Sequence, residues 1–146
     1  MKKLQRTSLG LAVLALVAAL PAGAQTSPIT VQAESMKLTS YVVETGNRIK
    51  LSAANGSAST VFSGATGTYD IQVFVIAESD GQPTLDVFKD ATKLGSYTYP
   101  LSATNATYTI KGASLTKGQT IRIDGHANGG AWARVDKIVF TPVAAP

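Results

Sequence analysis

The chain has 146 residues, one histidine, no cysteine and a formal net charge of +4. Without cysteine it cannot be a disulfide scaffold, and with one histidine it lacks the usual two-histidine metal spacings and Cys–His catalytic pairs. Three of the basic residues, Lys2, Lys3 and Arg6, lie before an N-terminal apolar run, so ten basic residues face nine acidic ones in the rest of the chain. That balance gives no support for nucleic-acid binding.

The N-terminus has the three parts of a secretory signal peptide. The basic residues are followed by the apolar run from Leu9 to Leu20 and by the small-residue cleavage site Ala22-Gly-Ala24. The apolar run is too short and wrongly flanked for a stable membrane span. We therefore expect a Sec-type signal peptide over residues 1–24, and one mature domain over residues 25–146 that has no membrane span and is secreted or periplasmic.

The mature segment alternates short stretches of apolar and β-branched residues with turns rich in Gly, Asn and Asp. A turn cluster is expected at Ala53–Ser57, and no segment has a convincing helical period. About ten short strands at regular spacing predict an all-β fold, a two-sheet β-sandwich or a barrel. In chain order the predicted strands are Ile29–Ser35, Tyr41–Glu44, Arg48–Ser52, Thr60–Phe62, Thr68–Ala77, Thr84–Lys89, Leu94–Tyr99, Ala106–Lys111, Gln119–Asp124 and Arg134–Thr141.

The longest predicted strand, Thr68–Ala77, is apolar on both faces. Residues 69, 71, 73 and 75 form one face, and Phe74 with Ile76 makes the second face apolar as well. Such a strand is typical of the centre of a sandwich.

The stretch Gly125–Phe140 holds the only tryptophan and the only histidine of the chain, in a loop rich in Gly and Asn. A period of two places Asp136 on the same face as Ile138 and Phe140. A carboxylate in those surroundings is costly unless it is paired, hydrogen-bonded or bound to a metal. A flexible loop, a large aromatic, a guanidinium and an acid favour recognition of a polar small molecule over catalysis.

Five motifs in order resemble the carbohydrate-binding modules of the family 6, 35 and 36 type. The resemblance covers essentially the whole mature segment. The motifs are Val31-Gln-Ala-Glu34, Tyr41-Val-Val-Glu44, Gly67-Thr-Tyr-Asp-Ile-Gln-Val73, Lys117-Gly-Gln-Thr-Ile-Arg-Ile123 and Arg134-Val-Asp-Lys-Ile-Val-Phe140. The resemblance implies a β-jelly-roll sandwich that binds polysaccharide or oligosaccharide without cleaving it.

The resemblance also implies a structural calcium ion at one edge of the sandwich. Carried over by position, its acidic ligands are Glu34, Glu44 and Asp136, with backbone carbonyls completing the shell. Calcium prefers six to eight oxygen ligands, which carboxylates from separate strands can supply. The alternative is that Glu34 and Glu44 face solvent and that Asp136 anchors a turn.

By loop position, Trp132 is the first candidate for stacking on a sugar, and Tyr41 is a second aromatic candidate. The alternatives are that Trp132 covers an edge of the core, and that Arg134 neutralises Glu78 or Asp136 across strands. The polar candidates for ligand binding are Arg134, Asn128, Glu78 and Asp80.

Catalysis has little support in the sequence. Glu78 and Asp80 are carboxylates two residues apart, whereas glycosidases normally bring their two acids from different elements. The alternative to sugar binding is an extracellular or periplasmic structural or adhesion protein. A flat, uncovered apolar patch around Phe74 and Ile76 would favour that alternative.

Overall fold

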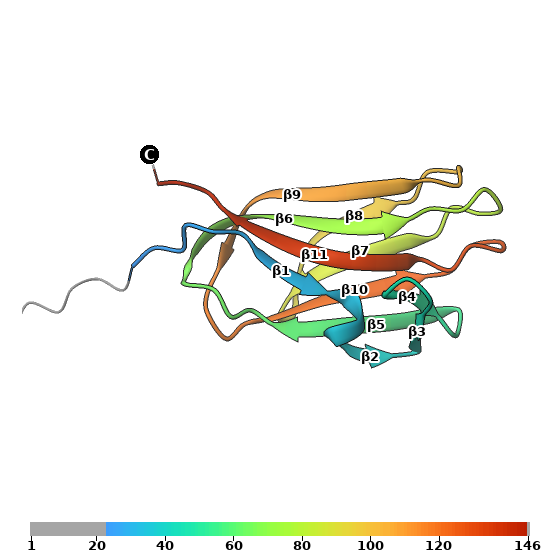
Figure 1. Cartoon of the computed structure of the whole chain (residues 1–146), viewed down its shortest axis with the longest axis horizontal. Coiled ribbons are helices and arrows are strands. Elements are labelled where there is room, and N and C mark those ends of the chain that lie inside the picture. The colour runs from blue at the N-terminus through green and yellow to red at the C-terminus, as the bar shows by residue number, and fades with distance from the viewer. Residues whose placement is uncertain (1–22, 146) are drawn as a thin grey trace, which may run out of the picture.

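The computed structural model describes residues 23–145 as two antiparallel sheets packed face to face (Figure 1). The predicted signal peptide falls almost entirely on residues 1–22, outside the described residues. Within the described part of the chain, no helix has the length and apolar character needed to cross a bilayer.

The described residues contain eleven strands and one 3₁₀ turn. The strands are β1 (Ile29–Gln32), β2 (Lys37–Thr39), β3 (Tyr41–Glu44), β4 (Arg48–Leu51), β5 (Asn55–Val61), β6 (Gly67–Ile76), β7 (Thr84–Lys89), β8 (Thr92–Thr98), β9 (Asn105–Leu115), β10 (Thr120–His126) and β11 (Arg134–Pro142), and the turn is η1 (Ala33–Ser35).

The first sheet has the strand order β3-β4-β11-β6-β9, with β1 also paired to β11, and the second has the order β2-β5-β10-β7-β8. Neighbours in both sheets are antiparallel. The predicted all-β sandwich of the jelly-roll type is therefore confirmed, and β6 is an interior strand of its sheet, as its apolar faces indicated.

The core fills the space between the two sheets, because one face of each strand is apolar. On β6 the buried side chains are the alternate residues 69, 71, 73 and 75. Phe62 packs edge-to-face against Tyr69 and Phe140, with ring centroids 4.9 and 5.2 Å apart. Such T-shaped contacts add to the area that the rings bury.

The structure differs from the sequence-based expectation at β1, β5 and β2. The first strand ends at Gln32, because residues 33–35 turn into η1 with Met36 donating to the Ala33 carbonyl. The turn expected at residues 53–57 is in part the start of β5, which pairs with β10 along its whole length. Strand β2 was not predicted, because three residues are too few to show a period.

The segments that lead into β1 and out of β11 lie at one end of the sandwich, and the loops before β7 and before β11 lie at the other (Figure 1). Both loops therefore project from the end opposite the segments that lead into β1 and out of β11. The residues predicted to bind a ligand come mainly from these two loops.

Candidate functional site

The loop after β6 and the loop before β11 dock against each other through one backbone and one side-chain hydrogen bond. Gly130 donates its N–H to the carbonyl of Asp80 at 3.1 Å, and Gln82 donates its N–H to Oδ1 of Asn128 at 3.0 Å. A Cβ on Gly81 would lie only 1.9 Å from the Asn128 carbonyl oxygen. Only glycine allows this approach, so the sequence fixes the two loops as one unit.

Trp132 lies between these docked loops and β11, two residues before the strand begins. Its backbone N–H donates to Oε2 of Glu78 at 2.9 Å, and its backbone carbonyl accepts from the backbone N–H of Leu51 at 3.1 Å. The side chain is half-buried and packs against the core, and the Lys50 ammonium lies 5.7 Å from its ring centroid. The backbone of Trp132 is thus held from two sides, and part of the indole ring remains accessible.

Arg134 connects three elements. Its Nε donates to Oε1 of Glu44 on β3 at 2.5 Å, and its Nη1 pairs with Oε1 of Glu78 after β6. The same Glu44 oxygen accepts from Nε of Arg48 at 2.6 Å. The predicted alternative that Arg134 neutralises Glu78 is confirmed. Two of its nitrogens are therefore engaged within the protein.

Glu44 and Arg134 each favour the charged form of the other. Burial raises the pKa of the Glu44 carboxyl, but the hydrogen bond and charge of Arg134, followed by those of Arg48, outweigh it, and the pKa lies below its usual value. Burial lowers the pKa of Arg134, but its bonds to Glu44 and Glu78 raise it above its usual value. Glu44, Glu78, Arg48 and Arg134 thus form a network of two acids and two bases.

Tyr41 is a core residue in this structure. Its side chain is buried and its hydroxyl donates to the Ala133 carbonyl at 3.0 Å. The ring is therefore not exposed for stacking on a ligand, contrary to what its place in the sequence suggested. The reason is that the ring lies against Gly125 of β10, where a Cβ would come within 1.9 Å of the hydroxyl.

Ala133 has a positive φ of 41°, in the left-handed region that non-glycine residues rarely adopt. It is fully buried between Trp132 and Arg134. The Tyr41 hydroxyl and the Trp132–Leu51 hydrogen bond hold this turn from both sides. Strained backbone of this kind clusters at ligand sites, where the surroundings over-determine it.

Asp136 lies in a β-bulge, which corrects the face expected for it. The register of β11 against β6 shifts between Val135 and Lys137. As a result Val135, Ile138 and Phe140 are buried together, and Asp136 is the extra, half-buried residue. The bulge re-aims the carboxylate away from the core, which removes the cost that a strict alternation would have imposed.

Glu34 is the one acid in the described residues with an orphaned buried oxygen, because its Oε2 has no hydrogen-bond partner. It lies in η1, which follows Gln32, the pairing partner of Lys137 beside the bulge. The turn η1 contacts both β11 and β4. Glu34 and Asp136 therefore come from neighbouring segments.

Glu44 does not join these two acids, because one of its oxygens accepts from two arginines. Within residues 23–145, no group of three or more Asp, Glu, His or Cys side chains could hold a metal ion. A calcium ion could still take oxygens from Glu34 and Asp136 together with backbone carbonyls and water. An orphaned buried carboxylate oxygen fits such a cation.

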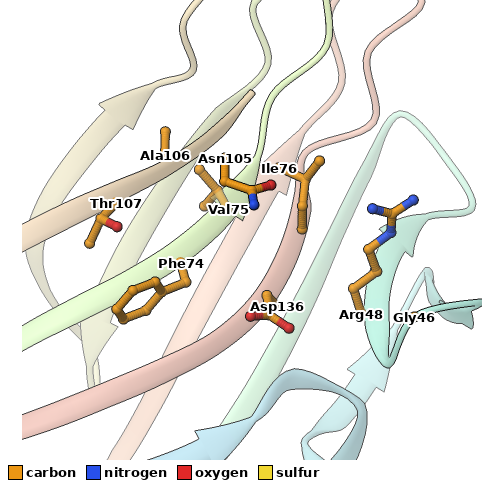
Figure 2. A pocket seen from close by; sticks show the side chains of 9 residues that line it. All are labelled: Gly46, Arg48, Phe74, Val75, Ile76, Asn105, Ala106, Thr107 and Asp136. Atoms are coloured by element: carbon orange, nitrogen blue, oxygen red, sulfur yellow. The ribbon is translucent and has the colours of Figure 1, made fainter. Parts of the chain in front are cut away.

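A pocket of about 420 Å³ opens on the outer face of the first sheet (Figure 2). It is lined by Gly46, Arg48, Phe74–Ile76, Asn105–Thr107 and Asp136. Phe74 and Ile76 are half-buried in it beside polar side chains. They form no flat apolar patch, so the observation that would have favoured an adhesion protein is absent from this face of the described residues.

Sequence reasoning missed three residues at this end of the molecule. Lys50 lies over the Trp132 ring, Arg48 binds Glu44, and Ala133 carries the strained turn. Local sequence carries no signal for Lys50 and Ala133, because their partners Trp132 and Tyr41 lie far along the chain. Arg48 is only four residues from Glu44, so the opposite charges on either side of the turn between β3 and β4 were a signal that could have found it.

No family model and no curated protein matches the chain. Several solved structures are similar to it. The CBM36-1 domain of a multidomain xylanase from the hindgut metagenome of Trinervitermes trinervoides is 24% identical, with a TM-score of 0.70, over 82% of this chain and 100% of that one. CBM35 from Paenibacillus barcinonensis is 24% identical, with a TM-score of 0.61, over 79% of this chain and 99% of that one.

A third structure, the carbohydrate-binding module CBM36 in complex with calcium and xylotriose, is 20% identical, with a TM-score of 0.61, over 77% of this chain and 99% of that one. These likenesses rest on backbone arrangement, since the identities are low. The chain has the β-sandwich fold of carbohydrate-binding modules of the family 6, 35 and 36 type.

Proposed function

We propose that this protein is an exported, non-catalytic module that binds polysaccharide through the loop end of its sandwich. The observation that carries the proposal is the held but partly accessible Trp132. Its backbone is fixed by Glu78 and Leu51, and its ring lies beside Lys50. A pre-organised aromatic surface with polar neighbours suits the apolar face and the hydroxyls of a sugar ring.

Within this site the candidate residues divide into two groups. Trp132, Asn128 and Asp80 keep groups free for a ligand, because the Asn128 amide nitrogen and the Asp80 carboxylate are on exposed residues. Arg134 and Glu78 are engaged with each other and act mainly by holding the loop. Glu78 is bonded on both oxygens, which does not suit a general acid or base, and supports binding over catalysis.

Calcium is part of the proposal as a structural ion, with Glu34 and Asp136 as its side-chain ligands. The support is the orphaned Oε2 of Glu34 and the outward-turned Asp136 of the bulge. A family 36 module of this fold was solved with calcium. When bound, the ion would stabilise the edge where η1, β4 and β11 meet.

The test is a binding screen of residues 25–146 against xylans, mannans and glucans in the presence of calcium. Trp132→Ala should abolish binding; because the half-buried ring also packs against the core, its melting temperature should fall, by about as much as that of the control variant. Phe88→Ala is the matched control, because Phe88 is a half-buried aromatic on the outer face of the second sheet. Wild-type protein that binds no polysaccharide, or Trp132→Ala that binds as tightly as the wild type, would refute the proposal.

A further inference from the structure

Strand β9 forms an edge of the first sheet, with β6 as its one hydrogen-bonded neighbour among the described strands (Figure 1). With eleven residues it is also the longest strand of the described part of the chain. The unpaired N–H and C=O groups along an edge are a template for a further strand, so proteins protect long edges. We therefore compared β9 with the other edges of the sandwich.

The other edge strands carry features that oppose pairing. β1, β2 and β3 have only four, three and four residues. β8 has seven residues, but its register against β7 shifts between Val87 and Phe88, and Lys93 lies at that bulge. Short length, bulges and charged side chains are the usual protections of an edge. These edges are therefore unsuited to receiving another strand.

The segment Asn105–Ile110 of β9 has none of these protections. It contains no charged residue, no proline and no glycine. Its register against β6 is continuous, because the shift in that pair lies further on, between Tyr69 and Ile71. Lys111 and Gly112, with a φ of 66°, follow the segment and end its regular part. Six residues of flat, neutral edge are thus open to pairing.

The backbone groups that point away from β6 can be assigned from the end of the strand. Ala77 donates its N–H to the carbonyl of Thr104 at 2.8 Å. The next pair, which contains Asn105, is therefore of the non-hydrogen-bonded kind. Because the two kinds of pair alternate, Asn105, Thr107 and Thr109 direct their N–H and C=O groups away from the sheet.

The inner side of the same segment is already held in place. Ala106, Tyr108 and Ile110 are half-buried and pack against the core. The Tyr108 ring stacks on Tyr97 of β8, with centroids 5.0 Å apart and 15° between the planes. A Cβ on Gly95 would lie 2.0 Å from the Tyr108 hydroxyl oxygen, so the ring occupies the space that this glycine leaves. A pre-organised strand loses little freedom when it pairs.

We propose that β9 pairs with β9 of a second copy of this chain, antiparallel, about a two-fold axis at Thr107. In this register Thr107 faces its own copy, and Asn105 faces Thr109 of the other. All three outward residues of each copy then exchange backbone hydrogen bonds. Cross-strand threonine pairs on the outer face add to the pairing.

Side-chain size and charge agree with this register. Ala106 of one copy faces Tyr108 of the other, so a small side chain lies opposite a large one. Lys111 faces Ala103, so no like charges meet across the axis. A second copy supplies this complementary neutral sequence by symmetry, and the pairing uses the β9 edge of both copies. The assembly therefore closes as a dimer.

The dimer has a consequence for binding, and this consequence alone rests on the proposed function. β9 begins at the loop end of the sandwich, where Thr104 bonds to the residue after β6. Antiparallel pairing places the loop ends of the two copies, each with its Trp132, at opposite ends of the dimer. Two sites that face apart bind two separate polysaccharide chains and cross-link them, without avidity for one chain.

The test is sedimentation velocity and light scattering of wild-type residues 25–146 from about 1 μM to about 1 mM, the range of dissociation constants for weak interfaces. The mass should double across this range and go no higher. Thr107→Pro should raise the dissociation constant at least about tenfold, because it removes the N–H at the axis in both copies. That N–H points away from β6, so the first sheet keeps its bonds and the variant should fold.

Thr107→Lys is the second variant, because it places two ammonium groups opposite each other at the axis without changing the backbone. It should be monomeric, with circular dichroism like that of the wild type. Thr98→Pro is the matched control on the β8 edge. Its N–H also points outward, since the Tyr99 N–H donates to the Pro83 carbonyl at 2.9 Å, and it should dimerise like the wild type.

A wild type that is monomeric at the highest concentration, or that grows beyond a dimer, overturns the proposal. So does a dimer that both Thr107 variants leave intact, or one that Thr98→Pro disrupts as strongly. A dimer that depends on Thr107 but binds no polysaccharide leaves the β9 pairing in place and overturns the proposed function alone.

Discussion

Arg134→Gln should destabilise the protein markedly, although Arg134 is the first residue of β11, next to a loop. The side chains of Arg134, Glu44 and Glu78 are only 14, 21 and 24% exposed. Removing the guanidinium leaves Glu78 without its cation and Glu44 with Arg48 alone. Breaking a buried pair costs about 3–5 kcal/mol and an exposed pair contributes about 0–1 kcal/mol. For this degree of exposure we expect about 2 kcal/mol.

That loss corresponds to a fall in melting temperature of about 6 °C for a domain of this size. The measurement is urea unfolding followed by Trp132 fluorescence, with thermal melting alongside. Arg134→Lys should lie between Gln and wild type, because an ammonium cannot present the planar fork that bridges two carboxylates. Arg122→Gln is the control, since its partner Asp124 is two residues away and the pair is 37 and 26% exposed. It should cost less than about 1 kcal/mol.

A double-mutant cycle of Arg134→Gln with Glu44→Gln should show coupling of about 1 kcal/mol or more, because the two groups share a hydrogen bond. Additive effects, or a loss below about 0.5 kcal/mol for Arg134→Gln, would refute the view that this residue holds the Trp132 loop. The oligosaccharide affinity of Arg134→Gln should fall along with its stability, through loss of the loop position.

Three further predictions follow from the same end of the molecule. Calcium at about 100 times its dissociation constant should stabilise the wild type by about 2.7 kcal/mol, as read from thermal melting with and without a chelator. Glu34→Gln and Asp136→Asn should remove this stabilisation, and Glu44→Gln should keep it. If calcium does not change the melting temperature of the wild type, the proposed ion is excluded. Gly81→Ala should lower the free energy of unfolding by about 1–3 kcal/mol, because the new Cβ would lie 1.9 Å from the Asn128 carbonyl oxygen. Gly67→Ala is the control and should be nearly neutral in the same urea unfolding assay, because no atom lies closer than 3.7 Å to its Cβ. The pKa of Glu44 is lowered in the folded state, so its charged form stabilises the fold. The difference in melting temperature between the wild type and Glu44→Gln should therefore be largest above about pH 4.3, the ordinary glutamate pKa, and should shrink as the pH falls through the pKa of Glu44 in the folded state. A difference that does not change down to pH 3 would contradict this.

The sequence was most informative where one local period dominates. Tyr41–Glu44 and Thr84–Lys89 were predicted with the bounds that the structure shows. The alternate residues of β6 are buried as expected. Burial of one face requires that face to be apolar, so a period of two is visible in the sequence whatever the strand pairs with.

Strand β5 shows the limit of local pattern. Its sequence Asn-Gly-Ser-Ala-Ser-Thr-Val resembles a turn, and only Ala58 is buried. It is a strand because β10 and β2 supply backbone partners on both sides. Gly56 is needed there because a Cβ would lie 2.7 Å from the backbone carbonyl oxygen of Ser40. Such pairing is a tertiary contact that overrides propensity.

The candidate site likewise has features that the sequence predicted and features that depend on tertiary contacts. The sequence by itself determined that an aromatic, an arginine and an acid follow a Gly- and Asn-rich loop, and that the fold is a sandwich. Only the tertiary structure decided that Glu44 binds Arg134, 90 residues away, and that a bulge turns Asp136 outward. A carboxylate takes the nearest cation or metal in space, and distance in space depends on strand register, which no local period encodes.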